Sequence, residues 1–275
     1  MSCRHPRTTP EGNNVDASAH PYAVEHDLIE PALRALGPRL LELPQQVQEK
    51  EGDLGPLTEL DLYVDRTLSA LLLEHFPDDG WISEESPRRT RDGRYWIVDP
   101  VDGTREVVAG IPEWAVSVGL WENGEARYGW LFNAQRDLVW HGGPGIGAWR
   151  DDTPIQVTRP ASPDQARVAV SRTDTKKGLI PSVEPEPIAV GSIAYKLGLV
   201  AAGEIDATVS VTPKNIWDIA GGIPIVLGAG GAVIEYRSGA SMAALDIDPP
   251  LQEGGLVAAH PDLVEQIRER YLLPE

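Results

Sequence analysis

The chain has 275 residues, a formal net charge of −18 and a hydrophobic content of 41%, which suits one large globular domain or two intimate ones. This acidity argues against binding to polymeric nucleic acid or to an anionic membrane, because both partners require a basic face. It does not exclude a small phosphorylated ligand, since bound metal ions reverse the sign of the charge locally. The single cysteine, Cys3, excludes a disulfide framework and a thiolate metal site.

The first 20 residues are polar and lack the apolar core of a secretory signal, so we expect a disordered tail. No run of about 18 apolar residues is present, and a transmembrane helix is therefore not expected. From these two observations the predicted location is the cytoplasm.

Two helices are predicted next. In the first, prolines at 31 and 38 predict a kink or a break, and the apolar residues at helical spacing are Val24, Leu28, Leu33, Leu36, Leu40 and Leu41. A polar loop follows at 48–56. The second helix begins after Thr58 as N-cap and ends before Pro77, with an expected buried stripe of Leu62, Leu68, Leu71, Leu72 and Phe76.

Residues 81–157 predict a largely antiparallel sheet, with a two-residue hairpin at Asn123-Gly124. After 160–163, strands alternate with helices, which favours an α/β arrangement. One helix runs from the N-cap Ser192 to Gly203, another spans 215–231 but is weakened by Gly221, Gly222 and Pro224, and a third closes the chain at 261–273. Strands are expected at 166–172, 205–211, 231–236 and 254–260. We predict an α+β domain over 21–158 and an α/β domain over 159–275.

Acidic residues recur at the predicted element ends. Two carboxylates end one buried strand, and such a placement is costly unless something neutralises them. Each site alone has a structural explanation: a helix dipole partner, a turn residue or a solvated side chain. Together, hard oxygen ligands without cysteine or histidine suit Mg²⁺, and two or three such ions clamp a phosphoryl group and activate water. The acidic positions are Asp61, Glu84-Glu85, Asp99, Asp102 and Asp218.

Four segments carry a resemblance to a known family. YWIVDPVDGTRE (95–106) and NIWDIAGG (215–222) resemble the two signatures of the inositol monophosphatase superfamily. WISEES (81–86) is similar to its Glu-Glu element, and KEGDLGPLTELD (50–61) to its Lys…Ser-Pro-x-Thr-x-x-Asp segment. The resemblance covers residues from about 22 to 270 and implies a layered αβαβα sandwich, sensitivity to lithium and often a homodimer.

The resemblance also implies roles for individual residues. Glu84, Asp99 and the Val101 carbonyl would hold one Mg²⁺, and Asp99, Asp102 and Asp218 would hold another. Thr104, paired with Asp61, would help Glu84 to activate the attacking water, and the amides of Gly103 and Thr104 would contact the phosphate. The implied reaction is direct in-line attack of water on phosphorus without a covalent enzyme intermediate. A small phosphorylated metabolite would be the partner.

The substrate is narrowed by two further resemblances. DGTRE and PKNIWD are similar to segments of 3′(2′),5′-bisphosphate nucleotidases, which favours 3′-phosphoadenosine 5′-phosphate. Inositol enzymes typically have an acidic residue seven positions before the second-signature aspartate, where this chain has Val211. Inositol 1-phosphate, fructose 1,6-bisphosphate and a broad range of sugar phosphates remain alternatives. Arg105, Lys196 and the N-cap Ser192 are candidate substrate contacts, although solvation or pairing with carboxylates explains the two cations equally well.

Three positions depart from the family pattern: Ser83 stands where glycine is common, Val107 where an aromatic residue is usual, and Pro224 inside the helix of Asp218. A proline in a helix interior costs roughly 3 kcal/mol unless the helix kinks. A non-catalytic, metal-binding regulatory protein is the alternative of a different class. The intact acidic set and Thr104 favour an enzyme over this alternative.

Overall fold

The computed structural model of the chain describes residues 20–42, 47–49 and 56–272. The predicted tail lies outside these residues except for His20, as does most of the predicted polar loop. The helices are α1 (Ala23–Glu42), α2 (Glu59–His75), α3 (Thr104–Val108), α4 (Arg172–Lys176), α5 (Ile193–Ala201), α6 (Ile216–Ala220), α7 (Gly222–Gly228) and α8 (Val264–Tyr271), with a 3₁₀ turn at Pro163–Gln165. No helix among the described residues is long and apolar enough to cross a membrane.

The strands form two main sheets. The larger sheet has the order β3-β4-β5-β6-β7-β8-β9, in which only β3 and β4 are parallel, so the predicted antiparallel sheet is confirmed. Its strands are β3 (Gly80–Ser83), β4 (Arg94–Asp102), β5 (Ala115–Glu122), β6 (Glu125–Asn133), β7 (Leu138–Gly143), β8 (Gly147–Arg150) and β9 (Thr153–Pro154).

The second sheet has five strands in the order β11-β10-β12-β16-β14 and mixes parallel and antiparallel pairs. These strands are β10 (Val168–Ser171), β11 (Ile188–Val190), β12 (Ala207–Ser210), β14 (Ala232–Glu235) and β16 (Leu256–Ala259). Two small ribbons complete the structure, β1 (Val47–Glu49) with β2 (Pro56–Thr58), and β13 (Lys214–Asn215) with β15 (Leu251–Gln252).

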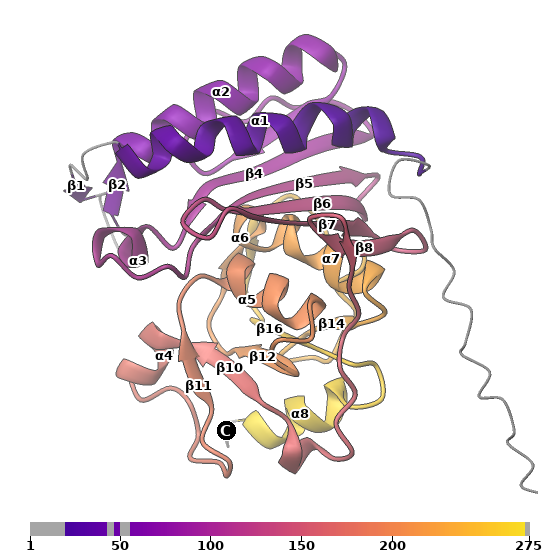
Figure 1. Cartoon of the computed structure of the whole chain (residues 1–275). Helices are drawn as coiled ribbons and strands as arrows, with labels where there is room; N and C mark the ends of the chain where they lie inside the picture. The colour runs from indigo at the N-terminus through magenta and orange to yellow at the C-terminus, as the bar shows by residue number, and fades with distance from the viewer. Residues whose placement is uncertain (1–19, 43–46, 50–55, 273–275) are drawn as a thin grey trace, which may run out of the picture.

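The elements stack in five layers (Figure 1). Helices α1 and α2 cover one face of the larger sheet, α5 to α7 lie between the two sheets, and α8 covers the outer face of the smaller one. The alternation of side chains along each strand produces this layering. In β4, Trp96 and Val98 join the core under α1 and α2, whereas Tyr95 and Ile97 join the core between the sheets. The predicted αβαβα sandwich is therefore confirmed.

The core between the sheets contains residues from both halves of the chain. Helices α6 and α7, which follow residue 159, pack directly on β5 and β6 of the larger sheet. The division into domains at 158 stays a prediction, since the two halves share this core.

Helix α1 departs from the prediction, because it is a single helix despite two internal prolines. Pro31 and Pro38 lie seven residues apart and are both exposed, so both stand on the side of the helix that faces solvent. The buried face of the helix is formed instead by Ile29, Leu33, Leu36 and Leu40. The stripe predicted for α1 was wrong at Val24 and Leu41, which are 71% and 57% exposed.

Helix α2 begins at the predicted N-cap, with the Thr58 hydroxyl accepting a hydrogen bond from the Leu60 amide. Its buried stripe differs from the predicted one, because Leu62, Leu71 and Phe76 are only half-buried. The fully buried apolar positions recur every four residues and are Leu60, Val64, Leu68 and Leu72. Asp61 and Asp65 lie in the same buried face, which directs two carboxylates inward.

The predicted helix over 215–231 divides into α6 and α7 at Gly221. Pro224 therefore occupies the first turn of α7, where its missing N–H has no intrahelical acceptor to lose. The division lets the backbone approach the larger sheet closely: a Cβ on Gly129 would lie 2.0 Å from the Gly221 carbonyl. The sheet also binds the end of α6, since Trp121 Nε1 donates to the Ala220 carbonyl at 3.0 Å.

Candidate active site

The predicted site residues converge on one cavity of about 380 Å³ between the two halves of the chain. Every one of them lines it except Asp61, which lies directly behind Thr104. The lining residues that the sequence predicted are Glu84, Asp99, Val101, Asp102, Gly103, Thr104, Arg105, Ser192, Lys196 and Asp218.

Glu84, Asp99, Asp102 and Asp218 form what we call the acidic wall of the cavity. The turn from β4 into α3 supplies two of these residues, Asp99 and Asp102. The register of β4 against β5 shifts between Asp99 and Asp102, so an extra residue bulges there and both carboxylates face the cavity. Gly103 ends the turn at φ +100°, a conformation that favours glycine, and an added Cβ would lie 3.1 Å from Ser192 Cβ. The glycine thus allows α3 to begin immediately at the edge of the site.

Asp61 and Thr104 form a buried pair behind the cavity. Asp61 is 1% exposed, and its Oδ2 accepts hydrogen bonds from the Thr58 amide at 2.8 Å and the Thr58 hydroxyl at 2.6 Å. The Thr104 hydroxyl lies 3.2 Å from Asp61 Oδ1 and 3.0 Å from the Val101 carbonyl. Since both neighbours only accept hydrogen bonds, the hydroxyl proton points to one of them and the oxygen lone pairs are left for another donor.

Asp102 connects the acidic wall to α5. Its Oδ2 accepts a hydrogen bond from the Ser192 hydroxyl and another from the Ala194 amide, both at 2.6 Å. The same hydroxyl accepts from the Tyr195 amide, which confirms Ser192 as the N-cap of α5. Gly203 follows the end of α5 at φ +68°, as predicted. Asp102 therefore acts as an acceptor at the beginning of a helix as well as a wall of the cavity.

Asp218 and Glu84 complete the acidic wall. Asp218 is the third residue of α6, and its Oδ2 accepts from the Asn215 amide at 3.1 Å in a capping box. Glu84 follows β3, whose last residue, Ser83, donates a 2.5 Å hydrogen bond to Asp65 of α2. This bond explains the serine at 83, because its hydroxyl ties the turn that presents Glu84 to the buried face of α2.

The carboxylates raise one another's pKa. Burial, followed by the charges of Glu84 and Asp102, raises the pKa of Asp99 well above its usual range. Burial and then Asp102 do the same for Asp218, and burial raises the pKa of Asp102 although hydrogen bonds from Ser192 and Ala194 oppose the shift. Asp99 Oδ1 accepts a hydrogen bond from the Val101 amide at 2.9 Å. In Asp99, Asp102 and Asp218 alike, one carboxylate oxygen thus accepts a hydrogen bond from the protein. The second oxygen of each accepts no hydrogen bond from any residue that the structure describes.

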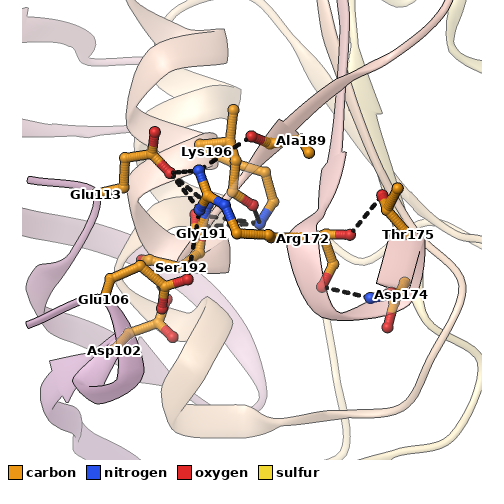
Figure 2. Close-up of polar contacts among 12 residues, drawn as sticks. Asp102, Glu106, Glu113, Arg172, Asp174, Thr175, Ala189, Gly191, Ser192 and Lys196 are labelled. Carbon is orange, nitrogen blue, oxygen red and sulfur yellow. Dashed lines mark hydrogen bonds and ion pairs between the residues drawn. The ribbon is translucent and has the colours of Figure 1, made fainter. Parts of the chain in front are cut away.

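Lys196 lines the cavity, but its ammonium group is engaged by the turn at 190–192 (Figure 2). It is 2% exposed, and its ammonium group donates to the carbonyls of Val190, Gly191 and Ser192 at 3.2, 3.3 and 2.9 Å. Burial lowers its pKa to about 8, although the charge of Asp102 opposes the shift. Because all three protons are engaged, a contact with substrate phosphate would require Lys196 to give up one of these bonds. Lys196 is therefore neither a solvated lysine nor one paired with a surface carboxylate, the two alternatives that the sequence left open.

Arg172 joins three segments at the same turn (Figure 2). It donates to Glu113 Oε2 at 2.8 and 2.7 Å and to the Ala189 carbonyl at 3.2 Å, and it lies 3.5 Å from Glu106 Oε1. Glu113 in turn accepts from the Gly191 amide at 2.8 Å. The turn that carries Ser192 is thereby held both by its carbonyls, through Lys196, and by its amide, through Glu113.

Ten further residues line the cavity and were not predicted as site residues, among them four charged residues and a threonine: Glu106, Asp174, Lys177, Lys214 and Thr212. Lys214 and Glu106 could have been found, since they stand within PKNIWD and DGTRE, but Asp174, Lys177 and Thr212 belong to no motif. Val211, at the position where inositol enzymes typically have an acidic residue, is buried in the core that α8 covers and does not line the cavity. Thr212 occupies the wall instead, and no residue from 211 to 215 supplies a carboxylate there.

A second group of ligand-type residues, His26, Glu30 and His141, lies under α1. Trp130 Nε1 donates to His26 Nδ1 at 3.2 Å, so the His26 proton is on Nε2, which faces Glu30 Oε2 at 3.0 Å. His141 Nε2 lies 3.2 Å from the Asp151 carbonyl, and its Nδ1 lies 2.9 Å from the Tyr128 hydroxyl. Both histidines therefore use both ring nitrogens in hydrogen bonds, which suits a structural network better than a metal site.

Comparison with known proteins agrees with this fold. The sequence profile of the inositol monophosphatase family matches residues 26–271, and the chain belongs to this family. It is 32% identical to the 3′-phosphoadenosine 5′-phosphate phosphatase of Mycobacterium leprae over 260 residues, which are 86% of this chain and 90% of that protein. It is 31% identical to the fructose-1,6-bisphosphatase/inositol-1-monophosphatase of Thermotoga maritima over 194 residues, 69% and 75% of the two chains.

The solved structures give the same assignment. The inositol monophosphatase (IMPase) of Thermotoga maritima superposes with a TM-score of 0.79 at 26% identity, covering 90% of this chain and 96% of that one. The chain is thus a phosphatase of the inositol monophosphatase family, a phosphoric monoester hydrolase.

Proposed function

We propose that the protein is a Mg²⁺-dependent phosphomonoesterase whose preferred substrate is 3′-phosphoadenosine 5′-phosphate. The observation that carries the metal dependence is the convergence of Glu84, Asp99, Asp102 and Asp218 on one cavity. Four carboxylates carry a charge of −4 when ionised, and two Mg²⁺ would offset it.

The donor set fits Mg²⁺. The acidic wall offers carboxylate oxygens and the Val101 carbonyl, with no thiolate or imidazole among the lining residues. The raised pKa values of Asp99 and Asp218 indicate negative charge that the described protein groups leave insufficiently balanced. Glu84, Asp99 and the Val101 carbonyl would hold one ion, and Asp99, Asp102 and Asp218 a second, with a third ion on the substrate phosphate compatible with the same wall.

When bound, the metal ions would neutralise the phosphate and favour the ionised form of a water molecule. The protein's own groups would orient the reactants. The Thr104 hydroxyl, donating to Asp61, keeps its lone pairs available to accept a hydrogen bond from the attacking water, and Glu84 is the second acceptor and the base for its proton. The first amides of α3, at Gly103 and Thr104, would donate to the phosphate oxygens, since N–H groups at a helix start lack intrahelical acceptors.

Three observations support the choice of substrate. DGTRE and PKNIWD resemble nucleotidase segments, and the relative from Mycobacterium leprae is named for this activity. The cavity wall at 211–215 presents Thr212 and Lys214 instead of a carboxylate that could accept from sugar hydroxyls. Inositol 1-phosphate and fructose 1,6-bisphosphate are the alternatives, favoured by the names of other relatives.

A substrate panel tests the proposal. Phosphate release with Mg²⁺ is measured for 3′-phosphoadenosine 5′-phosphate, inositol 1-phosphate and fructose 1,6-bisphosphate, each with and without lithium. We expect kcat/KM to favour the nucleotide about a hundredfold, or about 2.7 kcal/mol of differential transition-state binding. A preference for inositol 1-phosphate or a flat profile would contradict the nucleotidase assignment and leave a phosphatase of another specificity.

A further inference from the structure

The lysines of this protein are concentrated at one place. The chain has five lysines, and three of them, Lys177, Lys196 and Lys214, line the active-site cavity. In a protein with a net charge of −18 this is an unusual concentration of ammonium groups, and it lies in the same cavity as the four carboxylates of the acidic wall. If the carboxylates serve the metal ions and the scissile phosphate, the lysines are available for a different negative charge.

The three lysines do not have equal access to a ligand. Lys196 is buried, with its three protons on backbone carbonyls, and acts as a fixed positive charge at the site. Lys177 is exposed immediately after α4, and Lys214 is half-buried in β13. Lys177 and Lys214 are thus the two lysines of the cavity lining whose side chains are accessible to solvent. Lys214 would exchange one of its present hydrogen bonds for a bound anion. Arg105, predicted as such a partner, is exposed at the cavity edge on the opposite segment, α3.

Lys214 is held in place by a small polar unit. Its ammonium group donates to the Thr212 hydroxyl at 2.9 Å, to the Thr212 carbonyl at 3.3 Å and to the Pro213 carbonyl at 3.0 Å. The Thr212 hydroxyl lies 3.3 Å from each oxygen of Asp174, so it donates to that carboxylate and accepts from the lysine. Asp174, 3% exposed, belongs to α4, the helix that Lys177 follows. The hydrogen bond from Thr212 to Asp174 therefore connects the segment before β13, which leads to Lys214, with α4, which leads to Lys177.

The lysines are also close to the metal-site carboxylates. Lys214 lines the same cavity as Asp102 and Asp218 and stands four residues before Asp218 in the chain. A ligand phosphate near Lys214 would therefore be adjacent to the phosphate held at the acidic wall, and a cavity of about 380 Å³ has room for both. A second phosphate needs its own cationic partners, because charge-assisted hydrogen bonds supply most of such recognition.

We propose that Lys177 and Lys214 bind the second, non-scissile phosphate of a bisphosphorylated substrate, with Thr212 and Asp174 as positioning residues for Lys214. This inference rests on the proposed function for the identity of the substrate. It assigns the preference for a bisphosphate over a monophosphate to the C-terminal half of the chain, and the chemistry of phosphate release to the acidic wall.

The test compares substrates that differ only in the second phosphate. For wild type, kcat/KM is measured with 3′-phosphoadenosine 5′-phosphate and with adenosine 3′-monophosphate, and the ratio reports the second phosphate. We expect Lys214→Met and Lys177→Met each to lower this ratio about tenfold, while kcat/KM for the monophosphate changes less than about threefold. Lys214→Arg should restore most of the ratio, and added salt should lower it in wild type.

Matched variants separate this role from a general loss of structure. Lys176→Met removes an exposed lysine one position away that does not line the cavity, and it should leave the ratio unchanged. Thr212→Val should lower the ratio through KM with little change in kcat, and Thr212→Ser should rescue it. An unchanged ratio in both Lys177→Met and Lys214→Met would overturn the inference.

The outcome can be separated from that of the proposed function. If wild type hydrolyses neither adenine nucleotide, the nucleotidase proposal is wrong, and the same ratio is measured with fructose 1,6-bisphosphate and fructose 1-phosphate. Loss of that ratio in the lysine variants would still support the subsite. Equal efficiency of wild type with the bisphosphate and the monophosphate in both pairs would overturn it.

Discussion

The Ser192 hydroxyl donates a 2.6 Å hydrogen bond to Asp102 Oδ2, across 90 residues of sequence. The bond joins the acidic turn at the end of β4 to the N-terminus of α5, and the Ala194 amide adds a second donor to the same oxygen. Both hydrogen bonds fix the Oδ2 atom of Asp102 to the beginning of α5 and thereby set the orientation of the whole carboxylate. Ser192 adopts φ +48°, a conformation that costs a non-glycine residue free energy.

Two substitutions of Ser192 should distinguish the effect of its hydroxyl hydrogen bonds from the effect of its positive φ. Ser192→Ala and Ser192→Gly both lose the cap and the bond to Asp102, so each should lower kcat/KM about tenfold. Ser192→Gly should unfold at a free energy about 1 kcal/mol higher than Ser192→Ala, because glycine adopts the positive φ without cost. Denaturant unfolding and phosphate release measure the two effects. Equal stability of the two variants would show that the positive φ is not strained.

The pair of Asp61 and Thr104 predicts a specific loss of turnover. Thr104→Val keeps the shape of the side chain but removes the hydroxyl, and we expect kcat to fall about 10²–10⁴-fold, the range for a lost acid–base contact. Thr104→Ser retains the hydroxyl and should keep most of the activity. Steady-state kinetics at saturating Mg²⁺ compares the two. Similar kcat values for the valine and serine variants would exclude a role for this hydroxyl.

The raised pKa of Asp99 predicts that the metal-free protein loses stability as the pH rises. Because the folded state keeps the proton above the ordinary pKa of 3.8, the stabilisation is complete below that value and is lost as the pH rises through the folded pKa. In EDTA, Asp99→Asn should therefore weaken this decline and leave the melting temperature at neutral pH unchanged or higher. Unfolding is followed at a series of pH values.

Asp78→Asn, at an exposed position after α2, is the matched control for loss of one negative charge. Mg²⁺ should stabilise wild type more at pH 8 than at pH 5, because the metal competes with protons for the same carboxylates. A melting temperature for Asp99→Asn well below that of wild type in EDTA would contradict the electrostatic account.

The histidine network under α1 predicts an opposite pH dependence. Burial and the nearby His26 lower the pKa of His141 to about 4, from an ordinary value of 6.5. The unfolded chain then binds more protons between these values, so this group stabilises the fold above pH 6.5 and loses about 3 kcal/mol as the pH falls to 4. His141→Gln should remove that part of the profile, measured as the difference from wild type. His75→Gln, at an exposed position on α2, is the control.

The close approach of α6 and α7 to the larger sheet predicts a steric effect on the site. Gly129→Ala would place a methyl group 2.0 Å from the Gly221 carbonyl, three residues beyond Asp218. We expect a loss of about 3 kcal/mol in the free energy of unfolding and a lower kcat, because α6 must move. Gly145→Ala has open space and only its positive φ to oppose it, so it should cost about 1 kcal/mol and leave kcat unchanged. The free energy of unfolding and kcat are measured for both variants. Equal losses in the two variants would contradict the steric account.

The residues of the acidic wall were predicted from the sequence because they stand at element ends within segments that resemble the family's motifs. Such a prediction does not depend on the exact bounds of the helices. Prediction from the sequence failed where tertiary packing overrides a local rule. Helix α1 tolerates Pro31 and Pro38 because both face solvent, and periodicity alone does not tell which side of a helix packs on the sheet. The three hydrogen bonds from the Lys196 ammonium group were also not predicted, because their acceptors are the backbone carbonyls of the turn at 190–192 and do not depend on residue type.

The most direct test of the central claim is phosphate release from 3′-phosphoadenosine 5′-phosphate as a function of Mg²⁺ concentration, for wild type and for Asp99→Asn with a confirmed fold. The account predicts turnover in wild type that requires Mg²⁺ and falls at least about 10³-fold in the variant at every Mg²⁺ concentration. Equal residual rates in the two proteins, or turnover by wild type that persists in EDTA, would contradict the assignment of the acidic wall as the catalytic metal site.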